Sequence, residues 1–264
     1  MAHQARKRFG QNFLHDQAVI QRIIDVIAPH KGELLIEIGP GQAALTIPLL
    51  QAAGSIHAVE LDRDLIPIVQ ENCAPYGELT LHNADALKFD FRALKTDERK
   101  LRMIGNLPYN ISTPILFRLL EQRDVIQDMH FMLQKEVVDR MAAGPGSKTY
   151  GRLSVMLQAY CKVESLFDIG PGAFKPAPKI DSSIVRLTPL PADKDVISDH
   201  ASFAEIVTTS FGQRRKTLRN NLKKIMDVEQ IESTGIDPGC RAETLSVDDF
   251  RRLAELFHIS HSKD

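Results

Sequence analysis

The chain has 264 residues, of which 43% are hydrophobic and 25% charged, a balance that excludes an intrinsically disordered protein. The formal net charge of −1 gives no support to nucleic-acid binding by overall charge. No run of about 18 apolar residues could cross a membrane, and no signal-peptide pattern is present. Three separated cysteines form no CxxC pair, which argues against a disulfide framework or a thiolate metal site. We therefore expect a cytoplasmic protein with no metal and no membrane contact.

Strand and helix patterns alternate through the first half of the chain. Isoleucines at helical spacing from Ile20 to Ile27 predict an amphipathic helix that ends before Pro29. Alternating βαβ units around a mostly parallel sheet are predicted beyond it, and such sheets bind ligands outside the carboxyl ends of their strands. The strands are expected at 33–39, 55–60, 79–85, 101–106 and 128–134, and the helices at 44–54, 64–74, 113–122 and 136–143.

A second region begins where prolines and charges interrupt this pattern, at 188–195. We place a first domain at 1–189 and a second, wholly helical domain at 196–264. The segment SFAEIVTTSFGQRRKTLRNNLKKI, which starts at Ser202, is expected to be helical. Ser246 and Asp249 have the spacing of a capping box ahead of a final amphipathic helix.

A glycine-containing turn follows the first predicted strand. The stretch EIGPGQAAL places Gly39 and Gly41 where missing side chains let the backbone turn tightly against a ligand. Glu60 ends the next strand and is suited to accept hydrogen bonds from ribose hydroxyls. A nicotinamide site would share these features, but Ala43 and Ala44 stand where the dinucleotide pattern has its third glycine. S-adenosylmethionine has a ribose and an adenine but no phosphate, so it fits this loop better.

Asp85 ends the third strand of the series. Its carboxylate could accept a hydrogen bond from an adenine amino group, and it could equally cap a helix N-terminus. Gly39 with Gly41, Glu60 and Asp85 lie at three successive strand ends. This order favours a cofactor site over three unrelated local features.

The stretch GNLPYNISTP follows a further strand and combines an amide, a proline and an aromatic ring. An adenine amino nitrogen is a weak nucleophile because its lone pair is delocalised into the ring. We expect the Asn106 side-chain oxygen and the Leu107 carbonyl to accept its hydrogens, which aims the lone pair at a methyl donor. Pro108 would stiffen the turn, and the Tyr109 ring would stack on the base. The alternative is a strand-ending turn with a half-buried tyrosine.

Two basic clusters stand out from the balanced overall charge. One comprises Arg6, Lys7 and Arg8, and the other lies between Phe211 and Met226, a segment without any acid. Each could be an ordinary solvated surface, but together they favour a phosphate-backbone partner. The second cluster consists of Arg214, Arg215, Lys216, Arg219, Lys223 and Lys224.

Eight sequence blocks, in register over nearly the whole chain, carry a resemblance to a known family. They are KRFGQNFL (7–14), EIGPGQAALT (37–46), GNLPY (105–109), QKEVVDR (134–140), YGRLSV (150–155), GAFKPAPKIDSSIVRL (172–187), FGQRRKTLRNNL (211–222) and RAETLSVDDF (241–250). In these blocks the chain resembles the small-subunit (16S) ribosomal RNA adenine dimethyltransferases.

The resemblance implies an α/β fold, a Rossmann-like S-adenosylmethionine-dependent methyltransferase with a seven-stranded sheet and a small all-helical C-terminal domain that binds RNA. It implies transfer of four methyl groups to two adjacent adenines in the 3′-terminal hairpin loop of small-subunit rRNA, during 30S biogenesis. It places the target adenine between Tyr109 and Phe174. It places the cofactor on Asn12, Leu14, Gly39, Gly41, Glu60, Asp85 and Asn106. We expect a monomer that binds the rRNA and the 30S subunit.

Three alternatives stay open. A methyltransferase of the same superfamily could act on large-subunit RNA, although the basic C-terminal segment and the block GAFKPAPKIDSS favour the small-subunit type. A non-catalytic relative could serve as an RNA-binding factor, although Asn106, Tyr109 and Asp85 are all present. A nicotinamide oxidoreductase is the weakest of the three.

Overall fold

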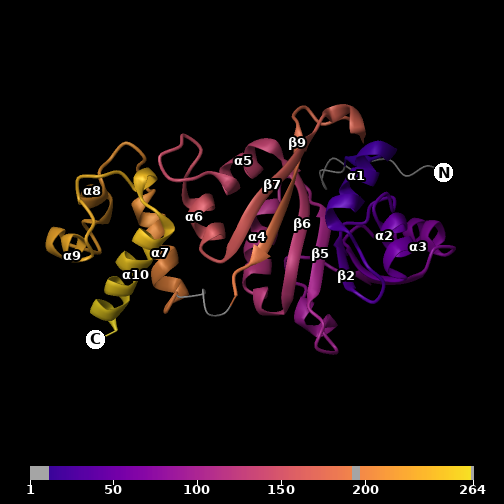
Figure 1. Ribbon diagram of the computed structural model, residues 1–264, viewed down its shortest axis with the longest axis horizontal. Coiled ribbons are helices and arrows are strands. Elements are labelled where there is room, and N and C mark those ends of the chain that lie inside the picture. Colours follow the sequence, from indigo (N-terminus) through magenta and orange to yellow (C-terminus); the bar gives the residue numbers. More distant parts are fainter. Residues whose placement is uncertain (1–11, 192–196, 263–264) are drawn as a thin grey trace. The chain divides into compact units, whose positions relative to one another are not determined.

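The computed structural model describes residues 12–191 and 197–262 (Figure 1). The chain divides into two compact units. The first is everything up to Val138 together with Glu164–Pro189, and the second is Asp139–Val163 together with everything from Leu190 on. Residues 139–163, which were predicted to belong to the first domain, therefore cluster with the C-terminal unit. Among the described residues, no helix is both long and apolar enough to span a bilayer.

A seven-stranded sheet with the order β4-β3-β2-β5-β6-β9-β7 forms the centre of the first unit. The ladders from β4 to β6 are parallel, and β9 runs antiparallel to β6. This confirms the mostly parallel sheet, and each of the five strands expected up to residue 134 is present. The strands are β2 (Leu34–Ile38), β3 (Ser55–Glu60), β4 (Glu78–Asn83), β5 (Leu101–Asn106), β6 (Ile126–Gln134), β7 (Cys161–Ile169) and β9 (Ser182–Pro189).

The expected helices connect these strands: α1 (Gln17–Ile27), α2 (Thr46–Ala53), α3 (Ile66–Cys73), α4 (Ser112–Leu120) and α5 (Lys135–Ala142). Helix α1 begins where the Asp16 carboxylate accepts the backbone N–H groups of Ala18 and Val19. It ends at Ala28, whose backbone is left-handed with φ 46°. The following proline, Pro29, disfavours continued helix at the residue before it.

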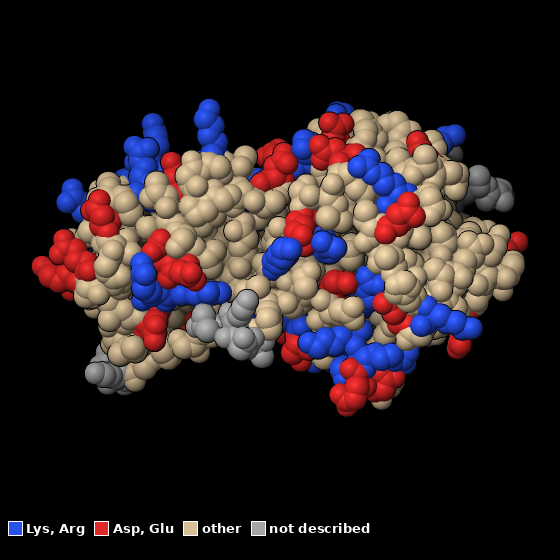
Figure 2. Space-filling model, viewed as in Figure 1, with Lys and Arg blue, Asp and Glu red and all other residues tan. Residues whose placement is uncertain are grey.

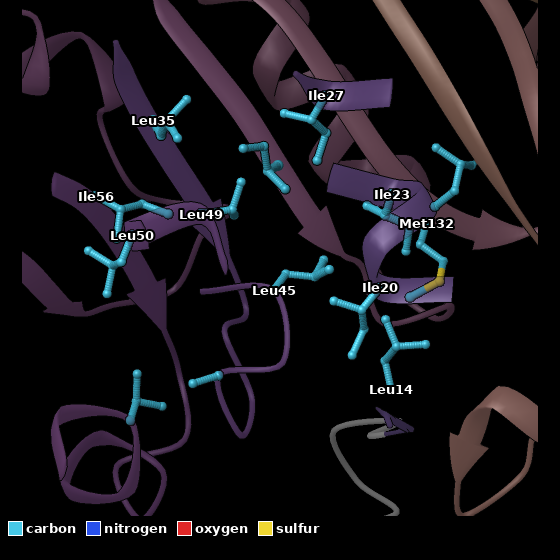
Figure 3. Close-up of a cluster of buried hydrophobic side chains, with 14 of the residues drawn as sticks. Leu14, Ile20, Ile23, Ile27, Leu35, Leu45, Leu49, Leu50, Ile56 and Met132 are labelled. Carbon is cyan, nitrogen blue, oxygen red and sulfur yellow. The ribbon is translucent and has the colours of Figure 1, made fainter. Parts of the chain in front are cut away.

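The hydrophobic cluster of the first unit draws side chains from α1, α2 and the strands β2 and β3 (Figure 3). Ile20, Ile23 and Ile27 come from one face of α1, while Leu35 and Leu49 represent β2 and α2. Burying one such side chain contributes about 1.5–3 kcal/mol. The cluster therefore fixes α1 and α2 relative to the central strands that carry the predicted ligand-binding loops.

A two-residue strand at the start of the described chain joins a distant loop. Strand β1 (Phe13–Leu14) pairs antiparallel with β8 (Phe174–Lys175), so that Leu14 lies opposite Phe174. The His15 N–H also donates to the Ala173 carbonyl at 3.0 Å. This small sheet holds residues 13–15 beside the loop that precedes β9.

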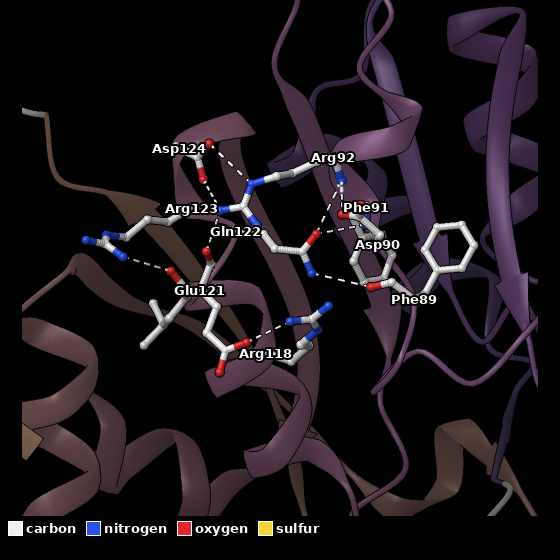
Figure 4. Close-up of polar contacts among 10 residues, drawn as sticks. Phe89, Asp90, Phe91, Arg92, Arg118, Glu121, Gln122, Arg123 and Asp124 are labelled. Carbon is white, nitrogen blue, oxygen red and sulfur yellow. Dashed lines mark hydrogen bonds and ion pairs between the residues drawn. The ribbon is translucent and has the colours of Figure 1, made fainter. Parts of the chain in front are cut away.

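A buried glutamine connects the segment after β4 with the end of α4 (Figure 4). The Gln122 side-chain oxygen accepts the N–H of Phe91 at 2.8 Å, and its amide nitrogen donates to the Phe89 carbonyl at 3.4 Å. Arg92 adds a bond to the Glu121 carbonyl at 2.6 Å. Helix α4 follows the NLPY segment. These bonds therefore connect the far end of α4 to residues 89–92, which follow Asp85 in the chain.

The second unit is helical and combines the two separated segments. Its helices are α6 (Arg152–Gln158), α7 (His200–Ser210), α8 (Leu218–Leu222), α9 (Val228–Ser233) and α10 (Val247–His261). The Tyr150 hydroxyl donates to the Leu245 carbonyl at 2.9 Å, and Arg251 donates to the Ala159 carbonyl at 3.1 Å. These bonds account for the grouping of residues 139–163 with the C-terminal part. The capping box at Ser246 and Asp249 is confirmed.

The prediction of one continuous helix from Ser202 through the basic cluster was wrong, because the helix is interrupted between Ser210 and Leu218. Helix α7 ends at Ser210, and Arg214, Arg215 and Lys216 lie in the connection to α8. The Asn221 side chain donates to the Ser210 carbonyl at 2.7 Å, replacing the bond that a further helical turn would supply. Gly212, a poor helix former, follows the end of α7.

Candidate active site

A cavity of about 340 Å³ opens at the carboxyl ends of four neighbouring strands. It is lined by the residues after β2, the end of β3, the residues after β4 and the NLPY segment after β5. The N-terminal residues Asn12, Phe13 and Leu14 complete the lining. The cavity lies where a parallel sheet is expected to bind its ligand.

The turn after β2 has the backbone that the glycines were expected to permit. Gly39 has φ 73° and Gly41 has φ 58°, both in the left-handed region. A side chain on Gly41 would meet the Phe13 ring at 3.3 Å. Gly41 therefore serves both the turn and the close approach of the N-terminal segment that covers it.

Glu60 lies at the end of β3 with only 7% of its surface exposed. Burial raises the pKa of its carboxyl group, and hydrogen bonds from the backbone N–H groups of Asp62 and Gly41 act in the opposite direction. The bond from Asp62 measures 2.8 Å. The carboxylate is thus oriented by backbone groups in the lining of the cavity, which suits an acceptor for hydroxyl donors.

Asp85 lines the same cavity, and its local role is visible. One carboxylate oxygen accepts the Leu87 N–H at 3.0 Å, while the Asp85 carbonyl accepts the N–H groups of Lys88 and Phe89. One oxygen of this side chain therefore caps the backbone that follows Asp85, as the alternative prediction had it. A carboxylate has a second oxygen with its own acceptor capacity, so the two interpretations are compatible.

The NLPY segment is held by its backbone on one side and by the N-terminal segment on the other. The Leu107 N–H donates to the Met132 carbonyl of β6 at 3.2 Å. The Asn106 side-chain nitrogen donates to the Asn12 carbonyl at 3.0 Å. Since the nitrogen is bound in this way, the carboxamide oxygen of Asn106 is the atom available to a ligand as an acceptor. Pro108 and Tyr109 line the cavity beside it.

Gly105 explains how β5 can lie so close to β2 just before this segment. A Cβ atom at Gly105 would stand 2.6 Å from the Ile38 carbonyl oxygen. No side chain fits there, so the glycine is required by close packing. The approach brings Asn106 directly beside the turn that begins at Gly39.

Phe174 is not among the residues that line the cavity. Its side chain is buried in the hydrophobic cluster, and it lies opposite Leu14 in the β1–β8 pair. Leu14 itself does line the cavity. The structure therefore brings together Asn12, Leu14, Gly39, Gly41, Glu60, Asp85, Asn106, Leu107, Pro108 and Tyr109, and it places Phe174 next to this group but outside the cavity lining.

Glu37, an acid inside the apolar strand β2, was not among the residues predicted from the sequence. It is 2% exposed, lines the cavity, and its Oε2 atom has no hydrogen-bond partner among the described residues. Burial raises the pKa of this carboxyl group to about 7. The single charged residue in the run LLIEI was a signal that could have identified it. A cationic ligand group would suit a buried acid of this kind.

The basic cluster of the second unit is exposed at all six positions predicted to contact RNA. Arg214 forms an ion pair with Glu243 at 2.9 Å and also donates to the Lys148 carbonyl. The second basic cluster predicted from the sequence, N-terminal residues 6–8, lies outside the described part of the chain. On the face shown in Figure 2, basic and acidic side chains are interspersed, so positive charge does not dominate that face.

Among the described residues, no cluster of His, Cys, Asp and Glu could hold a metal ion.

Comparison with known proteins decides the family. A sequence model of ribosomal RNA adenine dimethylases matches residues 2–258. The chain belongs to the ribosomal RNA adenine dimethylase family. As a member it is a methyltransferase, and its methyl donor is S-adenosylmethionine.

Two relatives of this dimethylase illustrate the similarity in sequence. Ribosomal RNA small subunit methyltransferase A of Hahella chejuensis is 57% identical over 255 residues, covering 97% of this chain and 93% of the relative. The protein of the same name from Marinomonas is 56% identical over 252 residues, covering 96% of this chain and 95% of the relative.

Two solved structures show the same fold. A dimethyladenosine transferase from Plasmodium falciparum superposes with a TM-score of 0.80 at 24% identity, covering 95% of this chain and 98% of the other. The 23S rRNA methyltransferase ErmE gives a TM-score of 0.72 at 24% identity, covering 93% and 99%. The expected Rossmann-like methyltransferase fold is thereby confirmed.

Proposed function

We propose that this dimethylase transfers four methyl groups to two adjacent adenines in the 3′-terminal hairpin loop of small-subunit rRNA, during 30S biogenesis. The observation that carries the proposal is the Asn106 carboxamide, which is tied through its nitrogen to Asn12 and presents its oxygen as an acceptor at the cavity. The relatives named small subunit methyltransferase A support the choice of substrate. We further propose that the protein acts as a monomer on the 30S subunit in the cytoplasm, where this substrate is found.

The residues at the four strand ends fit the methyl donor. S-adenosylmethionine, when bound, supplies a methyl group on a positively charged sulfur. The buried Glu37 carboxyl group, one oxygen of which has no partner in the described part of the chain, matches a cationic ligand, and Glu60 matches the ribose hydroxyls. We assign cofactor binding to Asn12, Leu14, Gly39, Gly41, Glu60, Asp85 and Asn106.

The NLPY segment is assigned to the target adenine. The Asn106 oxygen and the Leu107 carbonyl accept the hydrogens of the amino group, which lowers delocalisation of its lone pair into the ring. Tyr109 stacks on the base and Pro108 stiffens the turn. No strong base is needed, because the product releases its proton to solvent and catalysis comes from positioning and electrostatics.

Phe174 is proposed to cover the second face of the target base, as the family resemblance implies. Its position opposite Leu14, beside the cavity lining, supports this role. Since the Phe174 ring is buried in the hydrophobic cluster, covering the base requires the ring to turn out of that cluster. Phe174→Leu keeps an apolar side chain in the cluster and is expected to raise the KM for RNA while leaving cofactor affinity within about two-fold.

The exposed basic cluster is proposed to hold the phosphates around the target loop. Neutralising Arg214, Arg215 and Lys216 together should weaken RNA binding and flatten its dependence on salt, since each lost phosphate contact reduces the slope by about one. A control variant neutralises the exposed Lys31, Lys88 and Lys100 of the first unit. If the salt dependence of RNA binding is unchanged in the first variant, or changes equally in the control, the basic cluster does not bind the RNA phosphates.

The enzyme itself is tested by transfer of labelled methyl groups to three substrates: unmethylated small subunits, large subunits and naked small-subunit RNA. We expect label only in small-subunit RNA and a loss of about 10²–10³-fold with Asn106→Ala, the magnitude typical of one oriented hydrogen-bond partner. Label in the large subunit would show that large-subunit RNA is the substrate. No label with any substrate, despite cofactor binding, would favour a non-catalytic RNA-binding role.

A further inference from the structure

The far end of the Tyr109 side chain is bound by a residue outside the NLPY segment. The Tyr109 hydroxyl and the Ser182 hydroxyl lie 2.8 Å apart, and one donates to the other. Ser182 is the first residue of β9 and is fully buried. The two residues are 73 positions apart in the sequence.

This contact explains why the position carries tyrosine instead of phenylalanine. The ring lines the cavity, whereas its hydroxyl end is directed to β9, and burial raises the pKa of the hydroxyl group. The hydroxyl therefore stays protonated and needs a hydrogen-bond partner away from water. Ser182 supplies this partner without contacting the cavity, since it does not appear in its lining.

The beginning of β9 is firmly held, so it can serve as an anchor. Ser182 pairs in register with Gln134 at the end of β6. The next residue of that strand end, Lys135, donates its backbone N–H to the Asp181 carbonyl at 3.0 Å, so backbone bonds hold the chain on both sides of this pair. A group held on rigid strands positions its partner more precisely than one on a loop.

We infer that Ser182 is a positioning residue of the methyl-transfer site, fixing the plane of the Tyr109 ring for stacking on the target base. The inference rests on the proposed function and deepens it. Stacking on a base requires a defined ring plane, and a ring fixed at both ends loses less freedom when the base arrives. Ser182 acts only through the Tyr109 hydroxyl and touches neither base nor cofactor.

The variants Ser182→Ala and Tyr109→Phe remove the same hydrogen bond from its two ends. Each is expected to lower kcat by about 3- to 10-fold, the range of one net hydrogen bond. The affinity for S-adenosylmethionine and the KM for RNA should stay within about two-fold of the wild type. The double variant should lose no more than either single variant, because the bond is already absent.

Ser183→Ala is the matched control. It removes a hydroxyl from an equally buried neighbour in β9, but that hydroxyl points to Asp168 on the other side of the strand. Any general damage to β9 should affect both serine variants, whereas a role in holding Tyr109 affects only Ser182→Ala. Thermal unfolding of all variants verifies that the measured enzyme is folded.

Three outcomes would overturn the inference: wild-type kcat in Ser182→Ala, a further loss from Ser182→Ala in the Tyr109→Phe background, or an equal loss in Ser183→Ala. If Ser182→Ala does not fold, Tyr109→Phe alone decides, because it must show the same loss of kcat. A wild-type enzyme that methylates no adenine would refute the proposed function, and that result is distinct from all of these.

Discussion

Glu37→Gln is expected to make the cofactor-free protein more stable above neutral pH. In the folded state, burial raises the pKa of the Glu37 carboxyl group from 4.5 to about 7. The Thr46 hydroxyl partly opposes this shift, and the nearby Glu60 carboxylate adds to it. The folded protein therefore holds this proton more tightly than the unfolded chain. Stability falls as pH rises from 4.5 to about 7 and levels off above that, because the acid must ionise in a buried place.

The size of the effect follows from the shift. At about 1.4 kcal/mol per pKa unit, ionised Glu37 costs about 3 kcal/mol at about pH 8. At about pH 5 the same group is mostly protonated in the fold, and the cost is below about 1 kcal/mol. Glutamine has nearly the same shape and no charge, so it removes this cost at every pH.

The assay is urea unfolding of the wild type and of Glu37→Gln at both pH values, without cofactor. The stability gain of the variant should be larger at about pH 8 than at about pH 5 by about 2 kcal/mol. Glu71→Gln, an exposed glutamate on α3, serves as the control and should show no such difference. A gain that is the same at both pH values, or no gain at all, refutes the reasoning. The variant should also bind cationic S-adenosylmethionine more weakly, so stability and cofactor affinity change in opposite directions.

Three further predictions concern the framework of the site. Gly105→Ala forces a methyl group against the Ile38 carbonyl and should cost about 1–3 kcal/mol in thermal unfolding, whereas Gly172→Ala, which has open space, should be nearly neutral. Arg102→Ala removes a buried guanidinium and leaves the partly buried carboxylates of Glu33, between α1 and β2, and Asp128, in β6, without their ion pairs, which should cost about 3–5 kcal/mol by urea unfolding. Ser246→Ala breaks the α10 capping box and should cost about 0.5–2 kcal/mol in the C-terminal unit, measured by hydrogen exchange of α10.

The ordering of strands and helices in the first unit was readable from the sequence. Apolar periodicity reports which side of an element is buried, so β2, β3 and β5 and the face of α1 could be predicted from neighbouring residues alone. The parallel-sheet rule then placed Gly39, Glu60 and Asp85 at one edge, and all of them line the cavity.

Local pattern failed where a distant residue decided the outcome. The basic segment has helical composition, but α7 ends at Ser210, where Asn221 binds its carbonyl from beyond the turn. Residues 139–163 belong with the C-terminal unit because Tyr150 and Arg251 make bonds across large sequence separations. The sequence near Tyr150 or Arg251 contains no pattern that predicts either of these bonds.

The sequence by itself determined the strand-and-helix order, the residues at the strand ends and, through its motif blocks, the family. Only the tertiary structure decided how the reacting groups are oriented: the Asn106 amide is bound by Asn12 across 94 positions, and Tyr109 by Ser182 across 73. It also showed that Glu37 is a buried acid, one oxygen of which has no hydrogen-bond partner within residues 12–191 and 197–262. Periodicity records burial residue by residue, whereas the direction of a side chain and its partners depend on which distant segments the sheet brings together.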